Sequence, residues 1–84
     1  MHVTVISPER AVFDGAADAV VAPAFDGQVG ILPGHAPFMT LLGTGVLTVR
    51  VAGRGGGDRF EVSGGFLQVV GDAVRVVADR VEPA

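Results

Sequence analysis

The chain has 84 residues and a mass of 8.5 kDa, which is room for one hydrophobic core and excludes a multidomain enzyme. It contains no cysteine, so disulfides and cysteine-based metal sites are excluded. Its six basic residues are all arginine, and with nine acidic residues they give a formal net charge of −3, which argues against nucleic acid as a partner. No stretch approaches the roughly 20 apolar residues of a membrane-spanning helix. We therefore expect one domain, residues 1–84, that is not inserted in a membrane.

The amino-acid composition predicts an all-β fold. Hydrophobic residues make up 49% of the chain and are mostly valine and alanine, whereas only 6% of the residues are aromatic. Valine is stiff at its first side-chain torsion and suits a pleated sheet better than a helix. Thirteen glycines and five prolines interrupt the sequence every few residues. Short strands joined by turns are therefore expected throughout.

The first half of the chain is predicted to form four short strands. Val3 and Val5 alternate with polar residues until Ser7-Pro8, where proline would end ladder pairing. Asp14-Gly15 is expected to form a tight turn, because glycine accepts a positive φ angle. Phe25-Asp26-Gly27 is the next predicted turn. The predicted strands cover residues 3–6, 11–13, 18–22 and 28–32.

A stiff loop is predicted at residues 33–37. Pro33 and Pro37 bracket Gly34 and His35, and each proline biases the residue before it toward extended geometry. His35 is therefore the most constrained candidate for a functional side chain. It is either an ordinary surface or packed histidine at a corner of the chain, or a contact residue at a protein interface, since rigid scaffolds often display binding groups on loops. Three apolar residues nearby are expected to fill the core: Phe25, Phe38 and Met39.

The second half contains the clearest strand and the clearest flexible segment. Leu47, Val49 and Val51 alternate along one face of a half-buried strand at residues 46–51. Residues 53–58 are rich in glycine and are expected to form a mobile hairpin tip. Gly64-Gly65 indicates a bulge or a close approach of two backbones as much as a turn. The other predicted strands cover residues 38–42, 59–62, 66–70 and 73–78, a spacing typical of an antiparallel sandwich or barrel.

The sequence lacks the combinations of residues that most kinds of catalytic site need. Ser7 or Ser63 would have to combine with His2 or His35, yet neither serine has the sequence context of an activated nucleophile. The two histidines and the scattered carboxylates do not have metal-ligand spacing. The glycine-rich segment lacks the lysine of a phosphate-binding loop. We therefore expect no enzymatic activity, no metal and no cofactor.

Two blocks of sequence closely resemble the ε subunit of the rotary F-type ATP synthase, whose mitochondrial counterpart is called δ. They are Gly27-Gln28-Val29-Gly30-Ile31-Leu32-Pro33-Gly34-His35-Ala36-Pro37-Phe38, and Ser63-Gly64-Gly65-Phe66-Leu67-Gln68-Val69 with Val74-Arg75-Val76-Val77-Ala78-Asp79 after it. The resemblance covers essentially all 84 positions in order. It implies a roughly ten-stranded antiparallel β-sandwich, which longer relatives follow with a helical hairpin.

The resemblance also implies a non-catalytic connector in the rotor. In the family this domain binds the foot of the γ subunit and sits on the loops of the membrane c-ring, so that rotation of the ring turns γ. The implied γ contacts are Ser7 and His35. The implied c-ring contacts are Asp26, Gly27, Gln28 and Val29. The residues expected to shape loops are Gly30, Pro33, Gly34, Pro37, Gly64 and Gly65. The expected location is the cytoplasmic side of the bacterial inner membrane, peripheral to it.

The sequence departs from the family pattern in two ways, and each leads to a further expectation. Relatives often place an acid at the position of Gln28, so Asp26 is expected to supply the attraction to basic c-ring loops. The sequence stops where the helical hairpin should begin, and this chain is therefore expected neither to inhibit ATP hydrolysis nor to sense ATP. The alternative to a rotor subunit is a small β-sandwich interaction module of another assembly.

Overall fold

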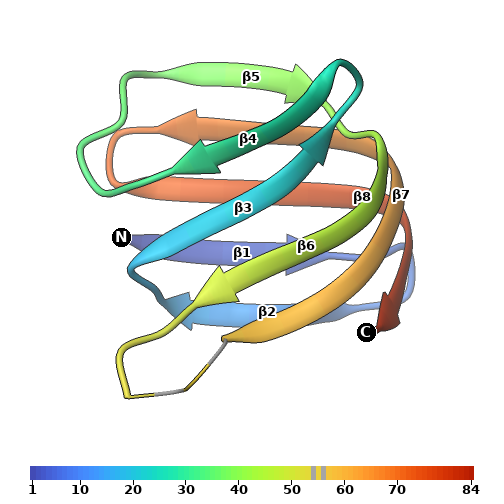
Figure 1. Ribbon diagram of the computed structural model, residues 1–84, viewed down its shortest axis with the longest axis horizontal. Coiled ribbons are helices and arrows are strands. Elements are labelled where there is room, and N and C mark those ends of the chain that lie inside the picture. The colour runs from blue at the N-terminus through green and yellow to red at the C-terminus, as the bar shows by residue number, and fades with distance from the viewer. Residues whose placement is uncertain (54, 56) are drawn as a thin grey trace.

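The computed structural model of the protein describes residues 1–53, 55 and 57–84, and these residues form strands and no helix (Figure 1). The strands are β1 (His2–Ile6), β2 (Ala11–Ala16), β3 (Ala19–Ala24), β4 (Gly27–Ile31), β5 (Phe38–Leu41), β6 (Thr44–Arg50), β7 (Asp58–Val70) and β8 (Ala73–Pro83). The all-β prediction is confirmed. The described residues contain eight strands, so the expected ten is too many.

The strands form two layers that share β7. The hydrogen-bonded order is β2-β1-β8-β7-β6-β3-β4, and β5 pairs with β7 off this path. The first half of β7 pairs with β6, whereas its second half pairs with β5. In Figure 1 the nearer layer holds β4, β3, β6 and the start of β7, and the layer behind it holds β5, β1 and β2. The long β7 and β8 pair along nearly their whole length and so join the two layers.

One strand pair departs from the expected antiparallel pattern. β1 runs antiparallel to β2 but parallel to β8, with Thr4 facing Arg75 in the parallel register. The other pairs among the described strands are antiparallel. The prediction of an entirely antiparallel sandwich is therefore wrong for the pair of β1 and β8. Their connection runs through the rest of the chain, so no hairpin turn sets their relative direction.

The core lies between the layers and is almost entirely aliphatic. The predicted alternation on β6 is confirmed, since Leu47 and Val49 are fully buried while Arg50 is exposed. Burying a valine or leucine side chain contributes about 1.5–3 kcal/mol, so this core is the main source of stability. The fully buried side chains come from both layers and include Val3, Val5, Val20, Ile31, Leu47, Val49, Leu67, Val69, Val74 and Val76.

Three predicted strand ends are wrong because neighbouring strands continue the pairing. β2 runs through Asp14-Gly15 to Ala16, with Asp14 facing Thr4 on β1, so no turn forms there. β7 runs through Gly64-Gly65 to Val70 as one strand. β8 does not end at Ala78 but continues to Pro83 alongside the first half of β7.

Gly64 and Gly65 are the point at which β7 changes layer. Their φ angles are 70° and 102°, in the region that favours glycine. Ser63 faces Arg80 on one side of them and Gly65 faces Ala78 on the other, so the register with β8 is unchanged. Of the three interpretations of this pair, a β-bulge and a turn are wrong, and a close approach of two backbones is confirmed at Gly65, which lies against the Val77 carbonyl.

The hairpin between β6 and β7 is confirmed, because Val49 faces Asp58 in antiparallel register. The predicted mobile tip at residues 53–58 includes Arg54 and Gly56, which lie outside the described residues. Within the described part of the chain, no helix is long and apolar enough to cross a membrane.

Candidate protein-interaction surfaces

The loop between β4 and β5 holds His35 in a defined position. Pro33 and Gly34 occupy the centre of a tight turn, in which Gly34 has a φ angle of 85° and the His35 N–H donates a 3.1 Å hydrogen bond to the Leu32 carbonyl. This is the arrangement of a type II turn, which favours proline and then glycine at its two central positions. The predicted stiff loop thus has a local cause in its own sequence.

The His35 ring is fixed on both sides. Its Nδ1 donates a 2.7 Å hydrogen bond to the Ala36 carbonyl, and its ring meets the Phe38 ring edge to face at 5.6 Å between centroids and 70° between planes. Phe38 in turn packs against the core. His35 is half-buried, so it presents one side of a held imidazole to the surface. Such a pre-ordered group loses little freedom when a partner binds.

Ser7 stabilises the turn between β1 and β2 through hydrogen bonds to Arg10. Its hydroxyl donates a 3.0 Å hydrogen bond to the Arg10 carbonyl and accepts a 3.3 Å hydrogen bond from the Arg10 N–H. The Ser7 N–H donates to the same carbonyl at 2.8 Å. Ser7 is only 8% exposed. The hydroxyl is therefore already satisfied within the chain.

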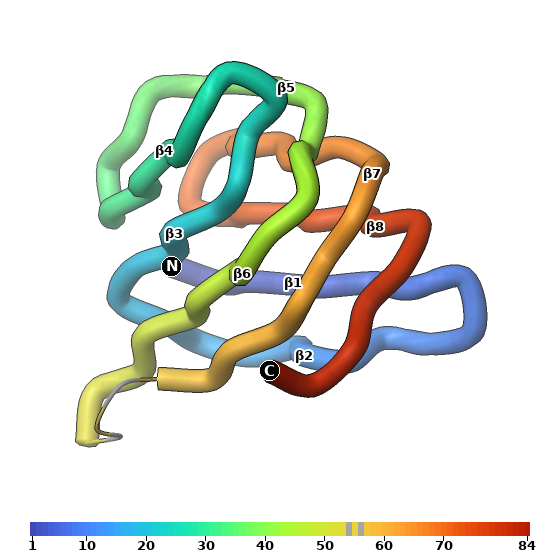
Figure 2. The backbone as a smooth tube through the Cα atoms, turned by 45° about the vertical axis from the view of Figure 1, so that its right-hand side comes forward, coloured from blue at the N-terminus to red at the C-terminus, as the bar shows by residue number. Residues whose placement is uncertain are grey.

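The two expected γ contacts lie at opposite ends of the molecule. Figures 1 and 2 both place the loop of His35, between β4 and β5, at the upper left and the turn of Ser7, between β1 and β2, at the right. The molecule measures 25 × 25 × 22 Å along its principal axes. The structure does not bring Ser7 and His35 into one patch, and a partner that contacts both would have to extend across the domain.

The residues expected to contact the c-ring form the hairpin of β3 and β4. Ala24 faces Gly27, which leaves Phe25 and Asp26 at the tip. Asp26, Gly27 and Gln28 are exposed. Val29 is half-buried and packs against the core, so it is the least accessible of the four expected contacts.

Of the residues expected to shape the loop between β4 and β5, three lie in that loop and one lies inside β4. Pro33, Gly34 and Pro37 lie in the loop between β4 and β5, as predicted. Gly30 lies inside β4 opposite Val21, where a β-carbon would meet no atom within 4 Å. Gly30 is therefore not required by the backbone.

Two of the three residues expected in the core are at the surface. Phe38 packs against the core, but Phe25 is 71% exposed and Met39 is 63% exposed. Alternation along β5 could have identified Met39, because it follows an inward-facing residue. No comparable signal was available for Phe25, which sits at a hairpin tip.

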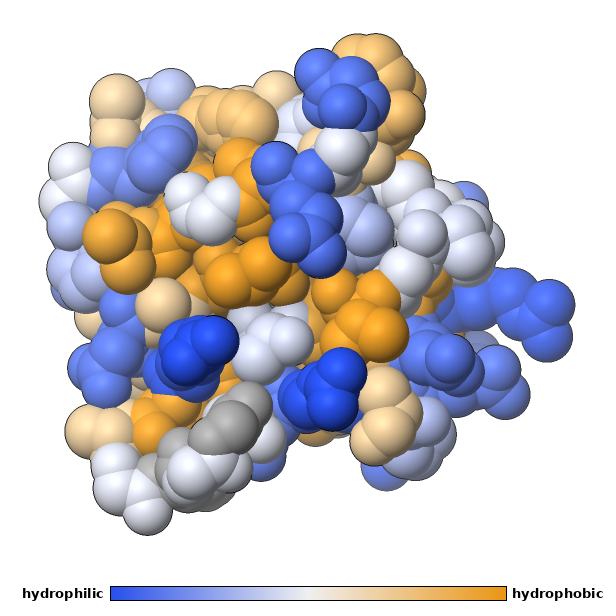
Figure 3. Space-filling view, viewed as in Figure 1, coloured by the Kyte–Doolittle hydropathy of each residue, from blue (hydrophilic) through white to orange (hydrophobic). Residues whose placement is uncertain are grey.

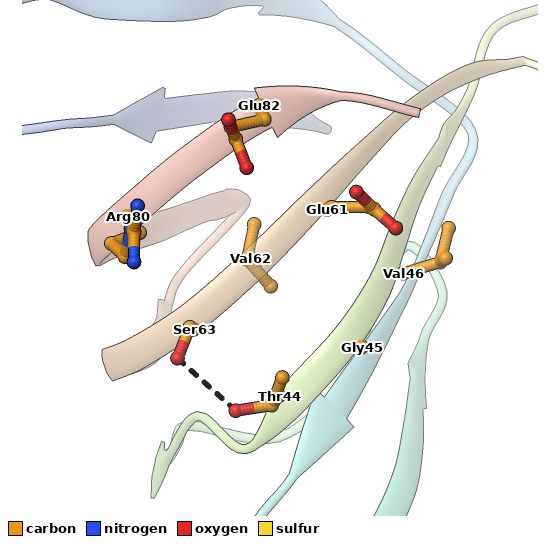
Figure 4. Close-up of a pocket in the computed structure, with 8 residues that line it drawn as sticks. All are labelled: Thr44, Gly45, Val46, Glu61, Val62, Ser63, Arg80 and Glu82. Carbon is orange, nitrogen blue, oxygen red and sulfur yellow. Dashed lines mark hydrogen bonds between the residues drawn. The ribbon is translucent and has the colours of Figure 1, made fainter.

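A hollow of about 340 Å³ lies on the outer face of β6, β7 and β8 (Figure 4). The Thr44 and Ser63 hydroxyls are hydrogen-bonded at 3.1 Å on one side of it, and Glu61 faces Glu82 across the strands on the other. No nucleophile lies beside a base there. In residues 1–53, 55 and 57–84, no group of three or more histidine, aspartate or glutamate side chains is placed to hold a metal ion.

A family model described as "ATP synthase, Delta/Epsilon chain, beta-sandwich domain" matches residues 1–84. The ATP synthase epsilon chain of Parasynechococcus marenigrum is 44% identical over 78 residues, which are 93% of this chain and 56% of that protein. That of a Nostoc species is 44% identical over 82 residues, which are 98% of this chain and 60% of that protein. The chain thus spans somewhat more than half the length of these relatives.

Two solved structures share the fold. A chain of the Euglena gracilis mitochondrial ATP synthase, in a structure of OSCP, F1 and the c-ring, matches with a TM-score of 0.87 and 25% identity over 96% of this chain and 51% of that one. A chain from the central stalk and c-ring of the Tetrahymena thermophila mitochondrial ATP synthase matches with a TM-score of 0.79 and 21% identity over 99% of this chain and 66% of that one.

Proposed function

The chain belongs to the family of ATP synthase δ/ε chain β-sandwich domains, and we propose that it connects the γ subunit to the c-ring in the central stalk of an F-type ATP synthase. The observation that carries this proposal is the family match over residues 1–84 together with the matching fold of an ATP synthase chain at a TM-score of 0.87. Residues 1–84 act in it as one domain.

The role proposed for the domain is mechanical and not catalytic. A part that transmits torque must resist deformation, and β7 and β8 extend through both layers and pair along nearly their whole length. An aliphatic core lies between the layers, and protein interiors of this kind are close-packed and have low compressibility. These features support a stiff connector whose contacts lie on its surface.

We assign the c-ring and the γ subunit to different elements of the domain. The hairpin tip of β3 and β4 offers Asp26 and Gln28 to the loops of the c-ring, with Asp26 supplying the negative charge that Gln28 lacks. The held ring of His35 contributes to the contact with γ. Ser7 shapes the turn at the other end of the domain and, if γ reaches it, contributes through that turn and not through a free hydroxyl. The complex keeps the domain peripheral to the cytoplasmic side of a bacterial inner membrane.

Reconstitution of the complex tests the proposed function. Membrane vesicles that contain the ATP synthase without this subunit should make ATP slowly from an imposed proton gradient, and the added chain should restore the rate and copurify with γ and the c-ring. A chain that neither binds γ nor restores synthesis would overturn the proposal. The outcome would then favour an interaction module of another assembly.

A further inference from the structure

The dipeptide Asp-Gly occurs twice in the chain, and its two copies lie in different structural settings. Asp14-Gly15 lies inside β2, whereas Asp26-Gly27 joins the tip of the β3–β4 hairpin to the first residue of β4. Figure 1 places that tip at the upper right and β2 in the lower part of the molecule. Figure 3 shows the corner of the tip as a protrusion on which hydrophilic atoms lie beside hydrophobic ones. The chain thus holds one dipeptide in two backbone environments.

Among aspartyl dipeptides, Asp-Gly rearranges most readily, because glycine has no β-carbon to hinder its own backbone nitrogen. That nitrogen attacks the side-chain carboxyl carbon of the aspartate, and the new N–C bond closes a five-membered succinimide ring. The protonated carboxyl group loses its hydroxyl, which leaves as water with the proton of the N–H. A water molecule then opens the ring. Opening at the original backbone carbonyl leaves isoaspartate, so water is the only co-reactant and the mass of the chain is unchanged.

No contact holds the Asp26 carboxylate away from the Gly27 nitrogen. Asp26 is exposed, and in the part of the chain that the structure describes its carboxylate makes no hydrogen bond or ion pair. Gly27 has a φ angle of 136°, in the region that favours glycine, and a β-carbon there would meet no atom within 4 Å outside its chain neighbours. The space beside this backbone is therefore open. Exposed tips also open locally at a lower free energy than core strands do.

The Asp14 carboxylate is held by the neighbouring strand. Its Oδ1 lies 2.5 Å from the Nε2 of His2 on β1. Asp14 also faces Thr4, and Gly15 faces Val3, in the antiparallel register of β1 and β2. The succinimide ring can close only if the aspartate backbone rotates, and this rotation would break the pairing of the two strands. Exposure does not distinguish the two sites, since the Asp14 side chain is itself 62% exposed.

We infer that Asp26-Gly27 is a site of spontaneous isomerisation to isoaspartate, and that strand pairing and the contact with His2 protect Asp14-Gly15 from the same reaction. The product keeps a carboxylate, so the charge of the tip is retained. Its backbone gains one carbon atom, and the carboxylate is now attached directly to the α-carbon. The added atom displaces the facing pair of Ala24 and Gly27 that closes the hairpin. The modification thus changes the shape of the tip and not its charge.

A consequence for coupling rests on the proposed function, in which Asp26 contacts the c-ring. A carboxylate displaced by the added backbone atom would meet a basic partner less well, so the aged wild-type chain should support less ATP synthesis in reconstituted vesicles than the fresh chain. Asp26→Glu keeps the charge, but its longer side chain would have to close a six-membered ring, which forms far more slowly. This variant should give the same rate whether fresh or aged. Equal rates with fresh and aged wild-type chain would overturn this consequence.

Peptide mapping of the isolated chain after incubation at neutral pH tests the inference and needs neither γ nor the c-ring. Endoproteinase Asp-N cleaves before aspartate and not before isoaspartate, and Asp18 lies between the two sites, so each site is measured separately. The chain contains no asparagine, and isoaspartate can therefore come only from aspartate. It should accumulate several times faster at Asp26 than at Asp14. In urea, where neither site is paired, the two rates should be similar.

His2→Ala tests the protection of Asp14 within the folded chain. The variant should raise the rate at Asp14 and leave the rate at Asp26 unchanged, and thermal unfolding checks that it remains folded. An unchanged rate at Asp14 would overturn the role of His2. Equal rates at the two sites of the folded wild-type chain, or no isoaspartate at Asp26, would overturn the inference as a whole. Failure of the proposed function would leave these rates as they are, because only the isolated chain is used.

Discussion

The backbone of Gly65 approaches the carbonyl oxygen of Val77 so closely that a β-carbon on residue 65 would overlap that oxygen. The approach occurs where β7 passes from one layer to the other, and the φ angle of 102° at Gly65 is itself unfavourable for residues with a side chain. Two independent requirements therefore select glycine at this position. The bend that lets β7 serve both layers depends on it.

Gly65→Ala should destabilise the domain. The positive φ angle alone costs about 1–3 kcal/mol for a residue with a β-carbon, and the overlap with the Val77 carbonyl adds to that cost. Urea unfolding should show a lower midpoint with little change in slope. Gly30→Ala is the matched control, because a β-carbon there meets no atom within 4 Å, and it should be neutral or slightly stabilising. Equal stability of the two variants would contradict this account of the bend.

Ser7→Ala should reduce stability before it affects any partner. The substitution removes a hydroxyl that makes two hydrogen bonds to Arg10 in a nearly buried turn, and the expected loss is about 1–2 kcal/mol in the free energy of unfolding. Ser63→Ala, which removes a hydroxyl paired with Thr44 at the surface, should cost less. Weaker γ binding by Ser7→Ala with unchanged stability would instead make the Ser7 hydroxyl a direct contact.

His35→Ala should weaken binding to γ several-fold while the domain remains folded. The ring is held by Ala36 and Phe38 at the surface, so its removal deletes a pre-ordered contact without opening the core. His2→Ala removes the other histidine, which pairs with Asp14 on β2, and serves as the control. Calorimetry with purified γ gives both affinities. Unchanged affinity of the His35→Ala variant would remove His35 from the interface.

Asp26→Asn should reduce proton-driven ATP synthesis in reconstituted vesicles. The change removes the exposed carboxylate at the tip of the hairpin of β3 and β4 and keeps its shape. Exposed ion pairs contribute about 0.2–1 kcal/mol, so the effect should be modest and should shrink as salt is raised. Asp18→Asn, at an exposed turn elsewhere, is the control. A loss that is the same at low and high salt would argue against an electrostatic contact by Asp26.

Features with a local cause were predictable from the sequence. The turn at Pro33-Gly34 follows from the backbone preferences of those two residues, and the burial of Leu47 and Val49 follows from alternation. The family resemblance also proved correct, because the family model matches residues 1–84. In each case the deciding information lies within a few neighbouring residues or within a specific motif.

Features that depend on distant strands were not predictable. Asp14-Gly15 has the sequence of a turn, yet β1 lies alongside and extends the strand through it. β8 was expected to end at Ala78 because nothing local shows that the first half of β7 lies beside residues 79–83.

The parallel pairing of β1 with β8 has a consequence for how the domain is made. During synthesis His2–Ile6 leaves the ribosome long before Ala73–Pro83 exists, so one edge of β1 has to wait for its partner while the rest of the chain emerges. Contacts this far apart in sequence slow folding, and an unpaired apolar strand is a site for aggregation. Completion of the sheet is thus a late event, and substitutions in β8 should lower the yield of folded protein in cells more than their effect on equilibrium stability alone would suggest.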